Sequence, residues 1–208
     1  MNTRKTSDNN RIMKGNFYVK YMLCLRDKNI VKSVLDDQAL NYRISDHGAI
    51  ELLQGITKSQ HQNLRMSLLR SGMYLLNQKE SMLIDRIINL IVDEIHNEDI
   101  LPDLTFSDII TQQRSLGEKS ILKIFSDVKG VSVLQFIVIQ KVERVKELLL
   151  YENRSLSEIA KFLNYKNKNF LIAQFKKITG LTPDYFKRLR KERIEVSKHQ
   201  LGTSELTN

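Results

Sequence analysis

The side chains in this sequence that could bind a ligand or take part in a reaction are those of one cysteine, four histidines and a dense group of lysines and amides near the C-terminus. Cys24 is the only thiol, so the chain can form no internal disulfide, which fits a reducing cytoplasm. The motif Met22-x-Cys24-x-x-Asp27 contains a lone thiol and a hard carboxylate, which is a poor set for a soft metal. No metal-ligand spacing relates the histidines, which are His47, His61, His96 and His199. We therefore expect no metal and no cofactor.

Enzyme chemistry and a membrane location also lack support in the sequence. There is no Gly-rich phosphate loop and no nucleophile–base signature, so we expect a protein that is not an enzyme. No apolar run reaches the length of a membrane span, and the first fourteen residues lack the apolar stretch of a secretory signal. We predict a cytoplasmic protein with a disordered tail at 1–16 and a flexible tail at 194–208.

The positive charge is concentrated in one short stretch. The net charge is +9, and residues 155–193 hold ten Lys and Arg against three Asp and Glu. A basic field of this kind attracts polyanions such as nucleic acids and speeds their encounter. A solvated basic surface would carry the same charge, so charge alone does not decide between the two interpretations.

An internal repeat appears when the chain is compared with itself at an offset of 50 residues. Residues 105–110 then align with 155–160, and 124–125 align with 174–175. The glycines Gly130 and Gly180 align, as do Phe136 and Phe186. Repeats of this length indicate a duplicated supersecondary unit.

Each copy has the pattern of a helix, a turn and a second helix. In the second copy Ser155 and Glu158 form a capping-box pattern at the start of an apolar periodicity. Polar residues 164–169 predict the turn, and Gly180 is suited to the left-handed end of the second helix. Thr182 followed by Pro183 then starts a further helix. Four phenylalanines are predicted to lie in the core, namely Phe125, Phe170, Phe175 and Phe186.

The first copy is less regular, and a helical segment joins it to the second. Thr105 is expected to cap toward Asp108, and Gly117 to open a helix that runs to Lys129. Between the copies, residues 131–152 have a helical apolar stripe and a length of roughly 33 Å. Successive major-groove segments on one face of a duplex lie about 34 Å apart. The linker can therefore place two recognition helices in successive grooves.

These segments closely resemble the AraC/XylS-type DNA-binding domain. SLSEIAKFLNY at 155–165, QFKKITGLTP at 174–183 and YFKRLR at 185–190 look like the second motif of that family, and KVERVKELL at 141–149 looks like its linker helix. Asn164 stands where the family usually has glycine, and asparagine tolerates the left-handed turn. Ala173 stands where an arginine or another polar residue is common. The resemblance implies a mainly α protein with a C-terminal seven-helix tandem helix-turn-helix domain at 80–193.

The resemblance also implies site residues and partners. The outward face of the second recognition helix would be Lys166, Asn167, Lys168, Asn169, Ile172, Ala173 and Lys176. In the first motif the corresponding face would be Glu118, Lys119, Ser120, Leu122 and Lys123. Asparagine can read adenine, and lysine can reach guanine or phosphate. Phosphate contacts would come from Lys176, Lys177, Lys187 and Arg190. Double-stranded DNA is the implied partner, with RNA polymerase and a second copy of the chain as further candidates.

The N-terminal segment predicts a small α+β domain at 17–77. Alternation over 17–26 is typical of a strand, and residues 30–35 suggest a helix. Residues 42–44 and 49–53 flank a predicted hairpin turn at 46–48. Residues 58–76 are predicted to be helical, with Leu64, Leu68, Leu69 and Leu75 on the buried face. This order suggests a ferredoxin-like sandwich resembling a degenerate heavy-metal-associated domain, followed by a helix at 81–96.

We therefore predict a sequence-specific transcriptional regulator that reads DNA with two helix-turn-helix motifs. Two alternatives stay open at this point. One is a regulator that responds to an effector or a metal through the N-terminal domain. The other is a module whose helix-turn-helix repeat binds a protein instead of DNA.

Overall fold

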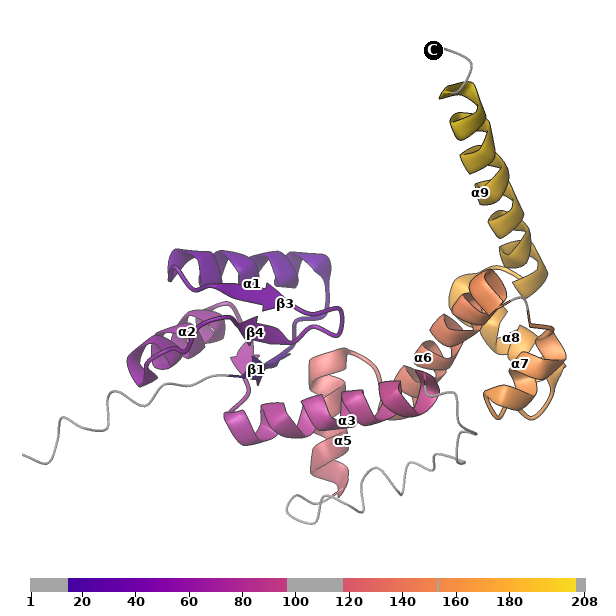
Figure 1. Ribbon diagram of the computed structural model, residues 1–208. Coiled ribbons are helices and arrows are strands. Elements are labelled where there is room, and N and C mark those ends of the chain that lie inside the picture. Colours follow the sequence, from indigo (N-terminus) through magenta and orange to yellow (C-terminus); the bar gives the residue numbers. More distant parts are fainter. Residues whose placement is uncertain (1–14, 97–117, 153, 205–208) are drawn as a thin grey trace, which may run out of the picture. The chain divides into compact units, whose positions relative to one another are not determined.

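The computed structural model describes residues 15–96, 118–152 and 154–204 (Figure 1). These residues fall into two compact units. The N-terminal unit holds residues 15–90 and 118–133, and the C-terminal unit holds 91–96 and 134–204. Every strand formed by the described residues belongs to the N-terminal unit, and helices predominate elsewhere. The predicted mainly α fold with a small α+β region is confirmed. None of the described helices combines the length and apolar character needed to cross a lipid bilayer.

The N-terminal unit is built on two small antiparallel sheets, one of three strands and one of two, which share one extended segment of the chain. One extended segment is interrupted at Tyr18, so that its first half pairs with β4 and its second half with β5. β4 also pairs with β3. The strand order is therefore β5, β2/β1, β4, β3 in a βαββαβ chain, which is the ferredoxin-like arrangement. The elements are β1 (Asn16–Phe17), β2 (Val19–Lys20), α1 (Leu25–Asp37), β3 (Tyr42–Ile44), β4 (Ile50–Leu52), α2 (Lys58–Arg70) and β5 (Tyr74–Leu75).

Both helices of this sandwich share one apolar core with the sheet. α1 contributes Val31 and Leu35, and α2 contributes Leu64 and Leu68, each at most 1% exposed. The sheet supplies its own apolar face, including Phe17, Val19, Ile50, Leu52 and Leu75. The predicted hairpin is confirmed, with Gly48 at φ 82° in the turn.

Two predictions for this domain are wrong. The first strand ends at Lys20 instead of residue 26, because Tyr21 adopts φ 68° and the Asp27 carboxylate accepts hydrogen bonds from the N–H groups of Leu23 and Cys24. These bonds start α1 at Leu25, so that Leu23 and Leu25 are exposed. The predicted helix 58–76 stops at Arg70, and the chain continues into β5, leaving Leu69 half exposed.

Helix α3 (Gln78–His96) begins against the first strand. The Ser81 hydroxyl accepts a hydrogen bond from the N–H of Tyr18, and the Tyr18 hydroxyl donates to Asp85 at 2.9 Å. Burial and this carboxylate raise the pKa of Tyr18. The predicted apolar face is largely confirmed by Ile84, Ile87, Ile88, Ile91 and Ile95, whereas Met82 is exposed.

The C-terminal unit contains the second repeat. Helix α6 (Val133–Glu147) continues into a π-helical turn, η2 (Leu148–Glu152), where Arg144 bonds both Glu147 and Glu152. Then follow α7 (Leu156–Phe162), α8 (Lys168–Thr179) and α9 (Pro183–Ser204). α9 thus extends through 194–204, where the sequence suggested a flexible tail.

The 50-residue repeat is exact in the backbone of its second half. Helix α5 (Glu118–Lys129) and α8 end 50 residues apart, and α6 and α9 begin 50 residues apart. The C-terminal glycines Gly130 and Gly180 are both left-handed, with φ 68° and 75°. Phe125 and Phe175, at matching positions, are fully buried. The expected first helix of the first copy, from Thr105 toward Ile110, lies outside the described residues.

Candidate nucleic-acid interface

The second helix-turn-helix motif is fixed by local hydrogen bonds that the sequence predicted. The Ser155 hydroxyl accepts from the N–H of Glu158, whose carboxylate accepts from the N–H of Ser155 at 2.7 Å. Asn164 adopts φ 52° in the turn, where the family resemblance led us to expect a left-handed residue. The N–H of Tyr165 then returns to the Ala160 carbonyl at 2.8 Å. These bonds set the direction in which α8 leaves the turn.

The buried face of α8 orients its opposite face toward solvent. Leu171 and Phe175 are fully buried, and the Phe175 ring meets the Phe186 ring of α9 edge-on, with centroids 5.6 Å apart. Ile172 is half-buried. The other residues predicted for the second recognition face are all exposed, namely Lys166, Asn167, Lys168, Asn169, Ala173 and Lys176. The surface that a major groove would meet is therefore accessible.

The electrostatics of this face favour an anion. No Asp or Glu occurs among the residues of α8, and among the described residues Lys166, Lys168, Lys176 and Lys177 form no ion pair with a carboxylate. Asn167 caps the helix, because its side-chain oxygen accepts from the N–H of Phe170 at 2.9 Å. The free N–H groups and the positive end of the helix dipole lie at the turn that holds Lys166 and Lys168, whereas Lys176 and Lys177 lie in the last turn of the helix.

Phe170 departs from the prediction that it is a core residue. It is 47% exposed, and its ring lies 6.3 Å from that of Tyr165 at 52°. The buried stripe of α8 begins one position later, at Leu171, and repeats four residues on at Phe175. Phe170 therefore lies beside the stripe, on the flank of the recognition face. Burial raises the pKa of Tyr165 to about 12, and its ring also packs under Lys141.

Helix α9 carries further cations close to the motif. It starts as predicted, with the Thr182 hydroxyl accepting from the N–H of Tyr185. Lys187 and Arg190, the predicted phosphate contacts, are half-buried. Arg188, which the sequence analysis did not select, is 62% exposed in its side chain and stacks over the Tyr185 ring at 4.8 Å. The sequence feature that could have identified Arg188 is the basic run at 187–193.

The recognition face of the first motif is less positive. Lys119, Ser120 and Lys123 are exposed on α5, and Leu122 is half-buried. Glu118 is the first described residue of α5, and its side chain lies outside the described residues. Lys123 is paired with Asp127, one turn further along, at 3.2 Å. This carboxylate offsets part of the charge that would face DNA.

Asp127 also joins α5 to strand β2 within the N-terminal unit. Its carboxylate lies 3.6 Å from the Lys20 ammonium, and its carbonyl accepts from the N–H of Tyr21 at 2.8 Å. Lys129 donates to the His47 carbonyl at 2.7 Å, and burial lowers the pKa of Lys129 to about 8. We name these contacts the β2–α5 junction. Sequence reasoning missed Lys20 and Asp127, for which the only signal was the four-residue spacing of Lys123 and Asp127.

Cys24 and Asp27 of the Met22-x-Cys24-x-x-Asp27 motif lie at the start of α1. Cys24 is exposed, and the Asp27 carboxylate beside it caps α1, which holds the pKa of Asp27 below its usual range through hydrogen bonds from Cys24 and Leu23. Among the described residues, no three His, Cys, Asp or Glu side chains gather around a point that could hold a metal ion.

Sequence comparison finds curated relatives that match part of the chain. Part of the chain is 27% identical over 108 residues to the bifunctional transcriptional activator/DNA repair enzyme AdaA of Bacillus subtilis, covering 44% of this chain and 51% of AdaA. It is 29% identical over 110 residues to the uncharacterized transcriptional regulatory protein YesN of the same organism, covering 52% of this chain and 29% of YesN. The chain therefore spans about half or less of the length of these curated relatives.

Solved structures of low similarity include the C-terminal domain of AraT, a response regulator from Geobacillus stearothermophilus, at 21% identity and TM-score 0.46 over 54% of this chain and 89% of that one. An AraC-type DNA-binding-domain regulator from Chromobacterium violaceum has 15% identity and TM-score 0.48 over 55% and 96%. The family model described as a helix-turn-helix domain matches residues 110–189, a stretch that holds α5 to α8 and the start of α9.

Proposed function

We propose that this protein is a sequence-specific DNA-binding transcriptional regulator that inserts α8 into the major groove. The observation that carries the proposal is the exposed face of α8, which is cationic, rich in amides and free of acidic residues. The helix-turn-helix family match over residues 110–189 supports it, as do two relatives whose names describe transcriptional regulators. The proposal assigns binding to the chain and no catalysis.

Within this proposal the residues divide into two roles. Lys168 and Asn169 lie at the exposed N-terminal turn of α8, the part of a recognition helix that meets base edges. Lys176 and Lys177 near its other end, together with Lys187 and Arg190 on α9, would contact phosphates. Base contacts confer sequence preference, whereas phosphate contacts fix position and contribute equally on every sequence.

The first motif would read a second groove segment through α5. The helical linker 133–152 is about 30 Å long at 1.5 Å per residue, close to the spacing of successive grooves. Lys119, Ser120 and Lys123 would supply the contacts, with Lys123 exchanging Asp127 for a phosphate. The proposal also includes activation of transcription through contact with RNA polymerase, and dimerisation with a second copy of the chain.

Selection from a randomised duplex pool, followed by a salt titration of the enriched site, tests the proposal. We expect two half-elements about one helical turn apart, with an affinity that falls steeply as salt rises. Lys168→Ala and Asn169→Ala should each lose about 1–3 kcal/mol of discrimination at one base pair. Lys187→Ala should weaken binding to all duplexes alike and reduce the salt slope by about one.

A matched control removes a lysine from the other end of the chain. Lys58→Ala takes an exposed cation from α2 in the small domain and should leave both affinity and base preference unchanged. Weak binding without any enriched site would sink the proposal. Equal losses on every duplex from Lys168→Ala, Asn169→Ala and Lys187→Ala would refute the division of roles.

The second candidate function is a regulator whose DNA affinity depends on an effector or a metal held by the small domain, which resembles a heavy-metal-associated module. The observation that favours it is the β2–α5 junction, because any shift of β2 would be transmitted to the first recognition helix through Asp127. Titration with candidate effectors and soft metals, followed by the fluorescence of the seven tyrosines and by DNA affinity, tests it. A saturable change in both signals supports this candidate, and a fluorescence change without altered DNA affinity contradicts it.

A further inference from the structure

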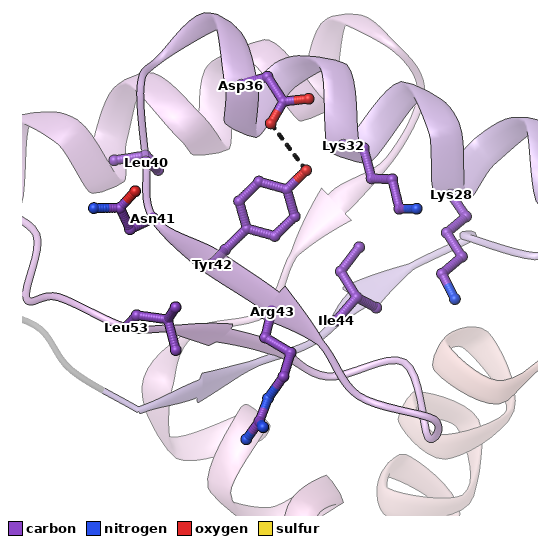
Figure 2. A pocket seen from close by; sticks show the side chains of 9 residues that line it. All are labelled: Lys28, Lys32, Asp36, Leu40, Asn41, Tyr42, Arg43, Ile44 and Leu53. Carbon is purple, nitrogen blue, oxygen red and sulfur yellow. Dashed lines mark hydrogen bonds between the residues drawn. The ribbon is translucent and has the colours of Figure 1, made fainter.

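A groove runs between α1 and the outer edge of β3 in the N-terminal unit (Figure 2). Its volume is about 530 Å³. Lys28 and Lys32 extend from α1 toward the strand, and the Tyr42 hydroxyl donates a hydrogen bond to Asp36 at 3.0 Å. The remaining lining comes from Leu40, Asn41, Arg43, Ile44 and Leu53.

The groove carries a net positive charge, because Lys28 and Lys32 outnumber the one carboxylate in its lining, that of Asp36. Among the described residues neither Lys28 nor Lys32 pairs with a carboxylate. Arg43, by contrast, points away from α1 and bonds Glu51 on the neighbouring strand at 2.6 and 2.9 Å (Figure 2). The groove therefore offers two ammonium groups together with the apolar side chains of Leu40, Ile44 and Leu53.

The strand that forms one wall has an open backbone edge. Within the described residues β3 pairs only with β4. The N–H of Leu53 donates to the Asn41 carbonyl, and the N–H of Ser45 donates to the Ala49 carbonyl, both at 2.9 Å. Alternate residues of an antiparallel strand bond the same neighbour, so Tyr42 and Ile44 direct their N–H and C=O groups outward. The edge thus presents both donors and acceptors.

These features together select one class of occupant. We propose that the groove binds an acidic, extended segment of a partner protein, which adds to the sheet as a strand beside β3. Its backbone would satisfy the donors and acceptors of Tyr42 and Ile44, and its carboxylates would meet Lys28 and Lys32. A phosphodiester or a small carboxylate has no donor for the open carbonyls. A second copy of β3 would bring its own lysines against these two.

Titration of the ¹⁵N-labelled full chain with three capped eight-residue peptides tests this proposal. The first alternates glutamate with valine, the second alternates lysine with valine, and the third is the first peptide with every backbone nitrogen methylated, so that it cannot donate to a strand ladder. We expect the first peptide alone to shift the amides of Tyr42 and Ile44 saturably and to slow their hydrogen exchange. Lys28→Glu combined with Lys32→Glu should weaken this binding roughly tenfold.

The control is Lys58→Glu, which makes the same charge change on α2 outside the groove and should alter the affinity less than about twofold. Absence of a saturable shift with the glutamate peptide overturns the proposal. Equal binding of the N-methylated peptide overturns strand addition and leaves an anion site. The same amide shifts produced by sodium glutamate, duplex DNA or a rise in protein concentration alone would overturn it in favour of those occupants.

Discussion

Two lysines share the Asp127 carboxylate, and their different burial predicts unequal contributions to stability. Lys20 and Asp127 lie 3.6 Å apart with side chains only 18% and 15% exposed, whereas Lys123 lies closer, at 3.2 Å, but is 72% exposed. Exposed pairs at this helical spacing contribute about 0.3–0.5 kcal/mol, and breaking a buried pair costs about 3–5 kcal/mol. For Lys20→Met we expect a loss of about 2 kcal/mol in the free energy of unfolding, and for Lys123→Met less than about 0.5 kcal/mol.

Urea denaturation at pH 7, followed by circular dichroism, measures both losses. Double-mutant cycles with Asp127→Asn isolate the pairwise energies, because this substitution keeps the backbone bond from Tyr21 to residue 127. High salt should remove the coupling of Lys123 and leave most of the coupling of Lys20, since screening acts mainly on exposed pairs. The reasoning is refuted if the coupling of Lys123 to Asp127 equals or exceeds that of Lys20.

Three further predictions concern stability. Ser155→Ala should cost about 1 kcal/mol in urea denaturation because it removes the cap of α7, while Ser157→Ala, its exposed neighbour, should be nearly neutral. Gly180→Ala should lower the free energy of unfolding by about 1–2 kcal/mol. The loss would come from backbone strain alone, because φ at this position is 75° and an added Cβ would meet no neighbouring atom. An unchanged stability would contradict the left-handed helix end assigned to Gly180. Burial, with Arg65 nearby, lowers the pKa of His61, so the unfolded chain takes up the proton first and stability should fall as the pH drops below about 6.5. His61→Gln should flatten this decline between pH 7 and 5, and an unchanged slope would argue against it.

The parts of the fold that the sequence predicted well depend on contacts a few residues apart. The caps at Ser155 and Thr182 and the left-handed residues Asn164 and Gly180 all form with the pattern expected. Each is determined by side-chain chemistry and backbone sterics within one helical turn, so no knowledge of the tertiary structure was needed. The recognition face of α8, which the family resemblance implied, is exposed except at the half-buried Ile172.

The features that the sequence did not predict depend on residues far apart in the sequence, or on which of two adjacent apolar residues is buried. β5 is only two residues long and is stabilised by pairing with β2, more than fifty residues away. The junction between Lys20 and Asp127 joins residues more than a hundred positions apart. Phe170 was misassigned by one position, because Phe170 and Leu171 are equally apolar and only packing decides which is buried.

The β2–α5 junction has a consequence for how the chain matures during synthesis. The sandwich is complete in sequence at Leu75, yet the N–H of Tyr21 and the carbonyl of His47 find their partners only at residues 127 and 129. A ribosome delivers the N-terminal part first, and domains fold as they emerge. The small domain would therefore fold with this edge unsatisfied, and α5 would dock on it as it left the exit tunnel, before α8 had been translated. The already folded small domain would then orient α5 of the first motif. The second motif would form afterwards through its own local hydrogen bonds and packing.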